Sequence, residues 1–426
     1  MSQIFEPFAR TEMLPPSEPP VLEKGWIKWA RENLFSSPLN AVMTVISLFI
    51  AYWLFAAIYP WFANSVWFAG SLTECRAINS GACFAVITER WAQLMFGFYP
   101  SQSYWRPTLA FALLIVAIAP VLYSELPRKI IWFTAIYPGL MVWLLWGGSL
   151  WGPIMAYAGL VGGWFLIKVV GGKLGVLATA IISALAVLIW WLFFSANAAQ
   201  FAQSLLPLDI ESVESRNFGG FMLSFVVGVT GIALSLPLGI LLALGRRSDL
   251  FFVRTICIGF IEFIRGVPLI TLLLVAATLL NIFLPPGTNF DIILRVIIMV
   301  TLFSAAYMAE TIRGGLAAIS RGQFEAADAM GLDYWQAQRL IVMPQALKVS
   351  IPGIVNNFIG LFKDTTLVSI IALLDPLGFA KAIRANADWN GIVWELYGFI
   401  AFVFFICCFG MSRYSQYLER KLRTTH

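Results

Sequence analysis

Ten apolar segments, each about as long as a membrane-spanning helix, constrain this chain more than any other feature of its sequence. A helix needs roughly 20 apolar residues to cross the hydrocarbon layer of a bilayer. The segments cover residues 39–59, 107–123, 130–147, 149–167, 175–195, 219–244, 253–283, 292–312, 351–373 and 393–412. The third and fourth are short and are separated only by a Gly147-Gly148-Ser149 turn, so they form either two spans or one re-entrant pair.

The composition leads to the same class of protein. Of the 426 residues, 60% are apolar and 12% are charged, whereas soluble globular proteins have about 45–50% apolar and about 25% charged residues. A soluble core of this length does not bury so much apolar surface. We therefore predict an all-α integral membrane protein with about ten transmembrane helices.

The residue counts exclude several kinds of chemistry. The single histidine is His426, which argues against a histidine base or a histidine-ligated metal. The five cysteines have no CxxC spacing, which argues against zinc, iron–sulfur and thioredoxin-like sites. We expect no catalytic residue and no metal site. The net charge of +5 is assigned to basic loops at the membrane and not to nucleic-acid binding.

The basic residues indicate the orientation. If the N-terminus is cytoplasmic, 20 of the 28 Lys and Arg residues fall on the cytoplasmic side and 7 fall outside, while Lys363 falls within a span. Because Lys and Arg concentrate in cytoplasmic loops, both termini should be cytoplasmic. Residues 1–38 are polar and rich in proline, so we expect a disordered cytoplasmic tail. No cleavable signal peptide is visible.

The spans fall into two blocks of different polarity. Residues 39–218 form an extension with five spans, a long outer loop at 60–106 and almost no polar residues at membrane depth. Residues 219–426 hold five more spans, with glycine, proline and paired charges in or beside the helices. We therefore look for function in the second block, and first in its polar cytoplasmic loop at 314–350.

This loop has the pattern of a helical hairpin. Ser320 with Gln323, and Asp333 with Gln336, have the spacing of capping boxes, so each pair should begin a helix. Gly331 stands where a left-handed residue would end the first helix. Pro344 should stop or kink the second helix. An ordinary interfacial hairpin would give the same pattern.

A motif within the loop points to a function. Glu325-Ala326-Ala327, then Gly331, Ile341 and Pro344, have the residues and spacing of the EAA motif, with Met343 where leucine is usual. The loop therefore resembles that of ABC importer permeases. Three further stretches resemble the polar amino-acid permeases of that family, in the order expected for their five core helices. They are Glu262 to Pro268, Ala305 to Gly315, and Lys363 to Ser369.

The resemblance implies a type I ABC importer core over 219–426. The EAA loop would form the coupling helix that docks on a separate ATPase, through Gln323, Glu325, Ala326, Ala327, Gly331, Ile341 and Pro344. The extra spans resemble those of the larger permease subunit of bacterial general L-amino-acid transport systems. The implied partners are a second permease subunit, with a heterodimer favoured, an ATPase dimer and a periplasmic amino-acid-binding protein. The implied location is the bacterial inner membrane.

The chain has no nucleotide-binding motif of its own. Gly172-Lys173 is followed by Leu174 and lacks the earlier glycine of a Walker A loop. We therefore expect no cofactor in this chain and no enzyme activity, with ATP and Mg²⁺ bound by the partner ATPase. A proton- or sodium-coupled secondary transporter is the alternative. Such a transporter would show broken helices at matching positions of two repeats, and the two blocks here differ in polarity.

Charged residues at membrane depth are costly and often functional. Glu262 with Arg265, and Glu310 with Arg313, are three residues apart, so each pair is expected to meet on one helix face in a structural role. Gly266 and Pro268 are expected to be structural too.

A second polar run is a candidate substrate path. It consists of Asn357, Lys363, Asp364, Thr365, Thr366 and Ser369, with Tyr307 and Glu310 one helix earlier. Thr365 and Ser369 are four residues apart and are expected to share a face. The alternative is that the hydroxyls bond to carbonyls of their own helix, and that Tyr307 only packs.

Two cysteines fall in the outer loop. Cys75 and Cys83 form a disulfide if that side is oxidising, and otherwise stay as two thiols. Cys257, Cys407 and Cys408 lie in or beside spans and are expected to behave as small apolar residues.

Overall fold

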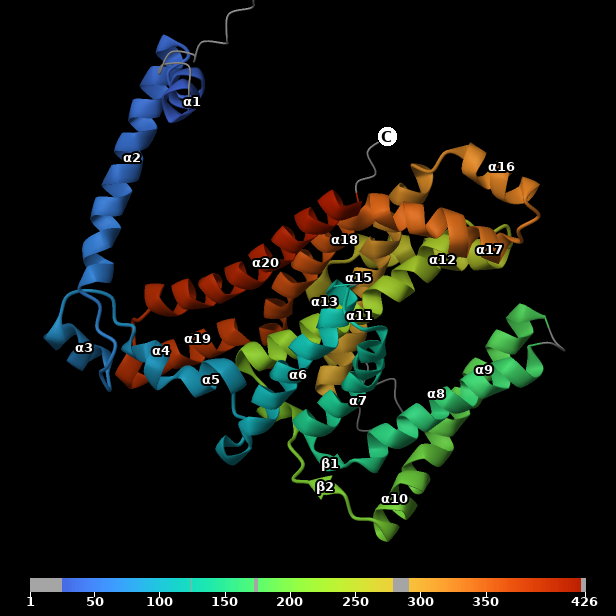
Figure 1. Cartoon of the computed structure of the whole chain (residues 1–426). Helices are drawn as coiled ribbons and strands as arrows, with labels where there is room; N and C mark the ends of the chain where they lie inside the picture. Colours follow the sequence, from blue (N-terminus) through green and yellow to red (C-terminus); the bar gives the residue numbers. More distant parts are fainter. Residues whose placement is uncertain (1–24, 124, 172–174, 279–290, 423–426) are drawn as a thin grey trace, which may run out of the picture. The chain divides into compact units, whose positions relative to one another are not determined.

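The computed structural model describes residues 25–123, 125–171, 175–278 and 291–422, most of which are helical (Figure 1). Sequence expectations for residues 1–24 of the tail, for 279–283 of the seventh apolar segment and for His426 lie outside these residues. Within them, the two short strands β1 (Gly148–Ser149) and β2 (Asp209–Ile210) pair in antiparallel fashion and are the exception to an all-helical fold.

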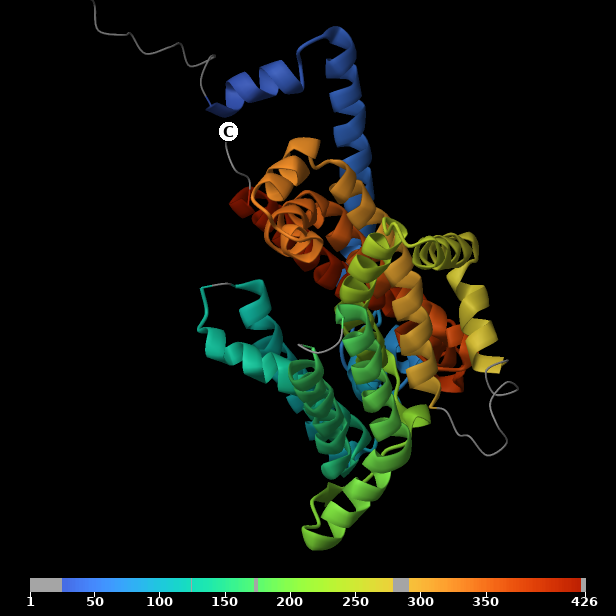
Figure 2. The same ribbon diagram turned by 90° about the vertical axis from the view of Figure 1, so that its right-hand side faces the viewer.

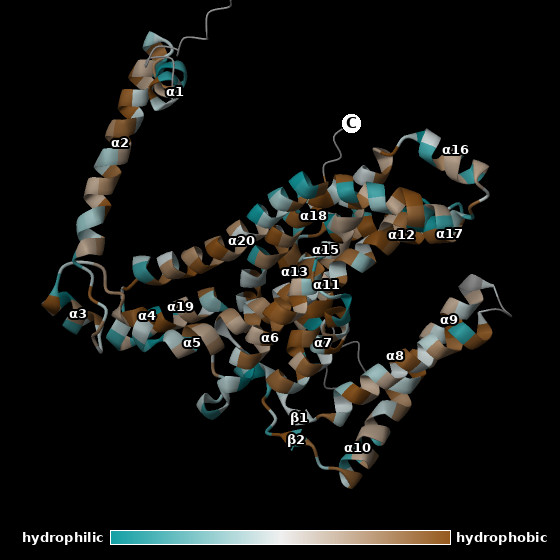
Figure 3. Cartoon of the chain, viewed as in Figure 1, coloured by the Kyte–Doolittle hydropathy of each residue, from teal (hydrophilic) through white to brown (hydrophobic). Residues whose placement is uncertain are grey.

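Nine of the ten apolar segments lie in helices that are long and apolar enough to cross a membrane, within the part of the chain that is described. These are α2 (Pro38–Ala63), α6 (Trp105–Leu122), α7 (Ile131–Trp146), α8 (Trp151–Val170), α9 (Val176–Ile189) with the turn Trp190–Phe194 and α10 (Ser195–Leu205), α11 (Gly220–Arg246), α15 (Ile292–Ala317), α18 (Met343–Asp364), and α20 (Trp394–Leu422). Helix α7, counted with the 3₁₀ turn Arg128–Ile130 before it, and α8 qualify separately, which favours two spans over a re-entrant pair. Figure 3 shows the apolar residues along these helices, with hydrophilic ones at the C-terminal end of α20.

The remaining segment, the seventh, at 253–283, is not one straight span within the residues described. It breaks into α12 (Phe251–Gly266) and α13 (Leu269–Thr278), which meet at an angle of 101°. Pro268 lacks a backbone N–H, and Val267 before it is extended, with φ −109° and ψ 131°. The helix therefore ends at Gly266, and Gly266 and Pro268 form the bend.

The chain forms two compact units. The first contains residues up to Trp67 together with Thr73–Phe84. It holds α1 (Gly25–Asn33), so the expectation of a disordered tail is wrong for these nine residues. They form a helix because their apolar and polar residues separate onto opposite sides.

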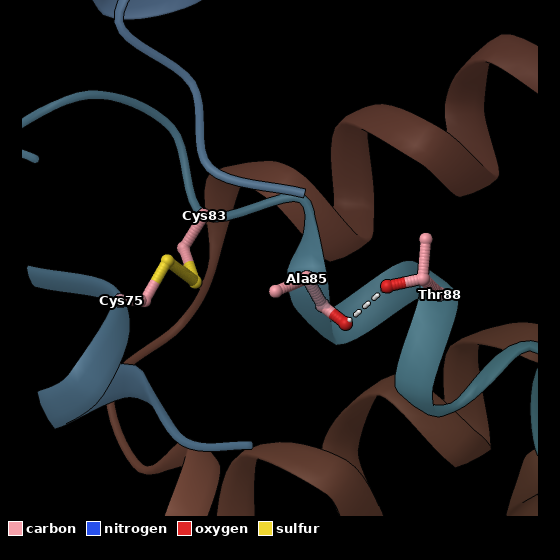
Figure 4. Close-up of a disulfide and its surroundings, with 4 residues drawn as sticks. All are labelled: Cys75, Cys83, Ala85 and Thr88. Carbon is pink, nitrogen blue, oxygen red and sulfur yellow. Dashed lines mark hydrogen bonds between the residues drawn. A yellow bond between two sulfur atoms is a disulfide. The ribbon is translucent and has the colours of Figure 1, made fainter. Parts of the chain in front are cut away.

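A disulfide closes the segment of this unit that follows α2. Cys75, in α3 (Leu72–Ile78), bonds to Cys83 (Figure 4). The backbone N–H of Ala82 donates to the Trp61 carbonyl at 2.8 Å, and the Val66 N–H donates to the Ala82 carbonyl at 2.8 Å. The two-thiol alternative is therefore not the one that the structure adopts.

The second unit contains 68–72 and the chain from Ala85 onward. It joins much of the predicted extension to the predicted core, because α6 and α7 pack on α11. Phe111 of α6 contacts Phe225 of α11 with ring centroids 5.2 Å apart. Trp146 donates its indole N–H to Ser215 Oγ at 2.6 Å, and the Ser215 hydroxyl bonds to Asp291, which caps α15.

Several short helices complete the second unit. They are α4 (Ala85–Glu89), α5 (Trp91–Phe96), α16 (Arg321–Ala329), α17 (Tyr334–Ala337) and α19 (Pro376–Ala385), with 3₁₀ turns at Ser101–Ser103, Arg128–Ile130, Ser215–Asn217, Thr365–Ile371 and Ala387–Trp389. The first two lie against the core: Phe98, just after α5, contacts Phe379 of α19 with ring centroids 5.1 Å apart.

Small residues let α11 and α15 pack closely. A Cβ on Gly239 of α11 would lie 2.6 Å from Met308 Cβ and 3.2 Å from the Ala305 carbonyl oxygen, both on α15. Ser235 and Ala243, four residues to either side, are fully buried. These two helices form the centre of the second unit.

The tight contact at Gly239 gives a testable prediction. Gly239→Ala should destabilise the protein by about 1–3 kcal/mol, because the methyl group overpacks the contact with Met308. The matched control is Gly259→Ala on α12, where a Cβ meets nothing within 4 Å. Thermal unfolding in detergent should show a lower Tm for the first variant only. Equal Tm values would contradict the packing described here.

A buried carboxyl begins α19. Asp375 is fully buried, and it accepts hydrogen bonds from the N–H groups of Leu377 and Gly378 at 3.2 and 2.9 Å. Burial raises the pKa of the Asp375 carboxyl to about 6, and these hydrogen bonds counter only part of that shift.

The raised pKa predicts a pH-dependent stability. The folded protein holds the Asp375 proton up to about pH 6, whereas the unfolded chain releases it near its ordinary value of about 4. The free energy of unfolding should therefore fall by about 2 kcal/mol as the pH rises from 4 to 7. Asp375→Asn keeps the helix cap and should remove this contribution. If the Tm difference between wild type and variant stays constant over this pH range, the prediction is wrong.

Candidate functional site

The loop at 314–350 forms the expected hairpin. Helix α16 begins after Ser320, and Gly331 has a left-handed backbone with φ +70°. Asp333 and Gln336 make a complete capping box: the Gln336 N–H donates to Asp333 Oδ1 at 2.8 Å, and the Asp333 N–H donates to Gln336 Oε1 at 3.1 Å. The expected box at Ser320 is wrong, because its side chain makes no capping hydrogen bond.

The motif residues divide between two faces of α16. Ala327 is fully buried against the protein, while Glu325 and Ala326 are exposed. Gln323 is held by the next helix, because Gln345 Nε2 donates to Gln323 Oε1 at 3.0 Å and also to the Ile341 carbonyl at 3.0 Å. The motif is therefore fixed by the buried Ala327 and by the hydrogen bond to Gln323, while Glu325 and Ala326 are open to the outside.

Large side chains lie exposed at the turn between α16 and α17, residues 330–335, which we call the elbow of the hairpin. Met330, Tyr334 and Trp335 are 72%, 52% and 58% exposed, and the two aromatic rings meet edge to face at 5.3 Å. The EAA motif does not include these apolar residues. In the sequence they can be found as two adjacent aromatic residues, Tyr334 and Trp335, directly after the helix cap Asp333.

Pro344 neither stops nor sharply kinks the chain, contrary to expectation. A π-helical turn, Gln338–Val342, follows α17, and α18 begins at Met343 with Pro344 in its first turn. The wider turn accommodates the proline ring and its missing N–H. The result is one continuous helix from Tyr334 to Ile371.

Five charged side chains form a cluster where α11, α12 and α15 meet. Arg246, in the last turn of α11, lies 2.6 Å from Glu310 and 3.0 Å from Glu262. Glu310 also pairs with Arg313 at 3.0 Å and with Arg265 at 3.8 Å. One carboxylate, only 17% exposed, thus holds three guanidinium groups from three helices.

The cluster corrects one expected pair and confirms another. Glu310 and Arg313 meet on α15 as expected. Glu262 pairs with Arg246 of α11 instead of with Arg265. Sequence spacing misses Arg246, because its role depends on α11 packing beside α12 and α15.

Tyr307 is linked to this cluster. The Arg265 guanidinium lies 5.5 Å from the centre of the Tyr307 ring. The ring centroids of Tyr307 and Phe303 are 4.9 Å apart. Farther along the α15–α18 contact, Asn357 Nδ2 donates to Thr311 Oγ1 at 2.8 Å. Tyr307, Glu310 and Asn357 therefore lie along one pair of helices.

The second group of path residues lies at the end of α18. Thr365, Thr366 and Ser369 each donate to a carbonyl three residues earlier, at 2.7, 2.9 and 3.2 Å. The segment is a 3₁₀ helix with three residues per turn, so Thr366 and Ser369 share a face, and the expected pairing of Thr365 with Ser369 is wrong. Thr365 is fully buried, Asp364 is half-buried and Lys363 is exposed.

Comparison with known proteins agrees with the motif. Residues 235–424 match the family described as the binding-protein-dependent transport system inner membrane component. The chain is 57% identical over 428 residues to the glutamate/glutamine/aspartate/asparagine transport system permease protein BztC of Rhodobacter capsulatus, covering 98% of this chain and 99% of that protein. It is 38% identical over 400 residues to the inner membrane amino-acid ABC transporter permease protein YhdY of Escherichia coli, covering 93% of each.

Among solved structures, the chain is similar to one described as an amino acid ABC transporter with histidines. The identity is 28%, the TM-score is 0.42, and the match covers 47% of this chain and 91% of that one.

These relatives define the class of the protein: it is a multi-span permease subunit of an ABC importer, and not an enzyme. The chain belongs to the family of binding-protein-dependent transport system inner membrane components, among its amino-acid permeases. Membership implies an ATPase and a binding protein as partners. It also sets aside the secondary-transporter alternative.

The charged cluster gives a third prediction. Glu310→Gln should lower the free energy of unfolding by about 1–3 kcal/mol, because three guanidinium groups lose the carboxylate they share. Glu262→Gln is the matched control. Its carboxylate is 53% exposed and pairs with Arg246 alone in the described structure, so the loss should stay below about 1 kcal/mol. Denaturation in mild detergent compares the two, and similar losses would argue against Glu310 as the centre of the cluster.

Proposed function

We propose that this chain forms half of the translocation path of an ATP-driven importer for acidic amino acids and their amides. The support for this substrate class is the full-length similarity to BztC, whose name gives glutamate, glutamine, aspartate and asparagine. In a complex reconstituted with its ATPase and binding protein, these four should stimulate ATP hydrolysis and uptake. Uptake that survives ATP depletion would contradict the proposal.

The observation that carries the coupling role is the geometry of the α16–α17 hairpin. Glu325 and Ala326 are exposed beside an exposed apolar elbow, while the buried Ala327 and the hydrogen bond from Gln345 to the exposed Gln323 anchor the hairpin. An outer carboxylate offers a partner to basic or amide groups, and a small alanine permits close approach of a second backbone. We infer that the ATPase docks on this outer side, with Gly331, Ile341 and Pro344 setting the angle and support of the elbow.

ATP and Mg²⁺ would be bound by the ATPase subunits. This chain would contribute no ligand to the nucleotide, since its part is to receive the movement that nucleotide binding produces. The mechanical route runs from the hairpin into α15, which precedes it, and into α18, which follows it.

For the substrate path we propose two groups of residues. Tyr307, Glu310 and Asn357 lie along the contact of α15 with α18, and Lys363, Asp364, Thr366 and Ser369 lie at the end of α18. Thr365 would not contact the substrate directly, because its side chain is buried; it would instead hold the helix in place behind the residues that line the path. Polar groups of both charges suit a zwitterionic substrate.

The assembly we propose is a heterodimer of this chain with a second permease, above an ATPase dimer and below a periplasmic binding protein. The long segment that precedes the family match supports unlike subunits. The location would be the bacterial inner membrane with both termini in the cytoplasm, which the excess of basic residues on that side supports.

The elbow gives a fourth prediction. Gly331→Ala should reduce substrate-stimulated ATPase activity and uptake by about tenfold, since a side chain strains the left-handed backbone by roughly 1–2 kcal/mol and turns the elbow. No atom lies within 4 Å of the new methyl group, so the effect comes from the backbone alone. Uptake and ATPase activity would be measured in proteoliposomes.

Two variants control this experiment. Gly322→Ala in α16 also meets no atom within 4 Å and has no left-handed backbone, so it should keep full activity. Gly331→Asn should recover part of the activity, because asparagine tolerates the left-handed conformation. Full activity in Gly331→Ala, or equal losses in both alanine variants, would argue against the elbow as the coupling element.

A further inference from the structure

Helix α1 has two chemically distinct sides. At 100° per residue, Trp26, Ile27, Trp29 and Ala30 fall on one side, and Lys28, Arg31 and Glu32 fall on the other. Trp26 is 84% exposed, and Ile27 and Trp29 are about half exposed. None of the nine residues is buried within the described structure. The apolar side therefore lacks a covering element in its own unit.

The apolar side is a continuous surface. Trp26 and Trp29 meet edge to face with ring centroids 6.0 Å apart. Trp26, Ile27, Ala30, Arg31 and Phe35 line a shallow hollow. Asn33 is the polar residue on this side, and its Nδ2 donates to the Trp29 carbonyl at 2.9 Å, so its amide is bonded to the helix itself.

A short joint holds α1 at the end of α2. Only four residues separate Asn33 from Pro38, and they are bonded locally. Thr44 Oγ1 donates to the Leu34 carbonyl at 2.8 Å, and Ser37 caps α2 by accepting from the Asn40 N–H at 3.2 Å. Figure 2 shows α1 running across the end of α2. Since α2 is long and apolar enough to span a bilayer, its N-terminal end, and α1 with it, would stand at the level of the lipid headgroups when α2 spans one.

We propose that α1 is an interfacial helix that lies on the bilayer, with Trp26, Ile27, Trp29 and Phe35 in the lipid and Lys28 and Arg31 toward anionic headgroups. Tryptophan favours the membrane interface, and basic residues near the surface attract anionic lipid. The segment 24–33 has three basic residues and one acidic residue, which fits a negatively charged surface. Continuity with α2 argues for lipid over a protein partner.

The test measures which side of α1 contacts lipid. In the full-length chain, Cys257, Cys407 and Cys408 are replaced by serine, and a single cysteine is introduced as Ile27→Cys or Glu32→Cys and labelled with bimane. The protein is placed in nanodiscs of phosphatidylcholine and phosphatidylglycerol that contain a lipid with a nitroxide near the top of its acyl chain. Ala30→Cys and Lys28→Cys form a second pair on the same two sides.

Positions 27 and 30 should be quenched by the nitroxide lipid about threefold more strongly than positions 28 and 32, and the order should reverse for iodide in water. Iodide quenching at all four positions without lipid quenching would place α1 in water and overturn the proposal. Protection of 27 and 30 from both quenchers would mean that a protein covers them, which also overturns it. Equal lipid quenching at all four would exclude the proposed orientation.

The basic residues provide an independent readout. Removing phosphatidylglycerol from the nanodiscs should weaken lipid quenching at position 27, and the double variant Lys28→Gln, Arg31→Gln should make that quenching independent of the lipid charge. A wild-type response that does not depend on phosphatidylglycerol would contradict the electrostatic part of the proposal.

Discussion

The second unit depends on the contact between α11 and α15. Small residues recur every four positions along α11, at Gly231, Ser235, Gly239 and Ala243, and α15 lies against them. In a bilayer, lipid tails are as apolar as the side chains, so helices associate through close van der Waals contact more than through hydrophobic burial. A stripe of small residues provides that contact. The positions of α12, of the hairpin and of α18 all follow from where these two helices lie.

The charged cluster and the hairpin both stand at one end of this contact. Arg246 extends from the last turn of α11 to Glu310 on α15, and Arg247 donates to the Leu316 carbonyl at 3.5 Å near the end of α15. Three residues separate the end of α15 from the start of the hairpin. The same two helices that pack by small residues are thus tied by charges next to the proposed docking element. A shift of the hairpin would act directly on the cluster.

Local patterns in the sequence predicted much of this architecture. The lengths of the apolar segments predicted nine of the membrane-spanning helices. The helix cap at Asp333 and the left-handed turn at Gly331 could also be predicted, because each depends only on residues nearby in the sequence. The errors arose where distant parts of the chain decide. The partner of Glu262 is sixteen residues away on another helix, and the 3₁₀ geometry after Asp364 changes which hydroxyls share a face.

Two further errors came from weighing composition over pattern. Prolines in residues 1–38 suggested disorder, although the nine residues of α1 alternate with the period of an amphipathic helix. Pro344 suggested a break, although a π-helical turn absorbs it. Both cases show a local rule overruled by the segment around it. The EAA motif depends on several residues at fixed spacing and not on a single residue, so it was less open to this kind of error.

The unbroken run from Tyr334 to Ile371 has a mechanical consequence. Thirty-eight residues of helix extend about 55 Å, well beyond the roughly 30 Å of hydrocarbon in a bilayer. The run stays helical through the π-helical turn Gln338–Val342 and past Pro352, and it ends in the 3₁₀ segment Thr365–Ile371. A tilt of about 10° would carry one tip about 10 Å relative to the other. A force applied at the aromatic pair Tyr334 and Trp335 would thus reach the threonines at the far end as displacement, by leverage alone.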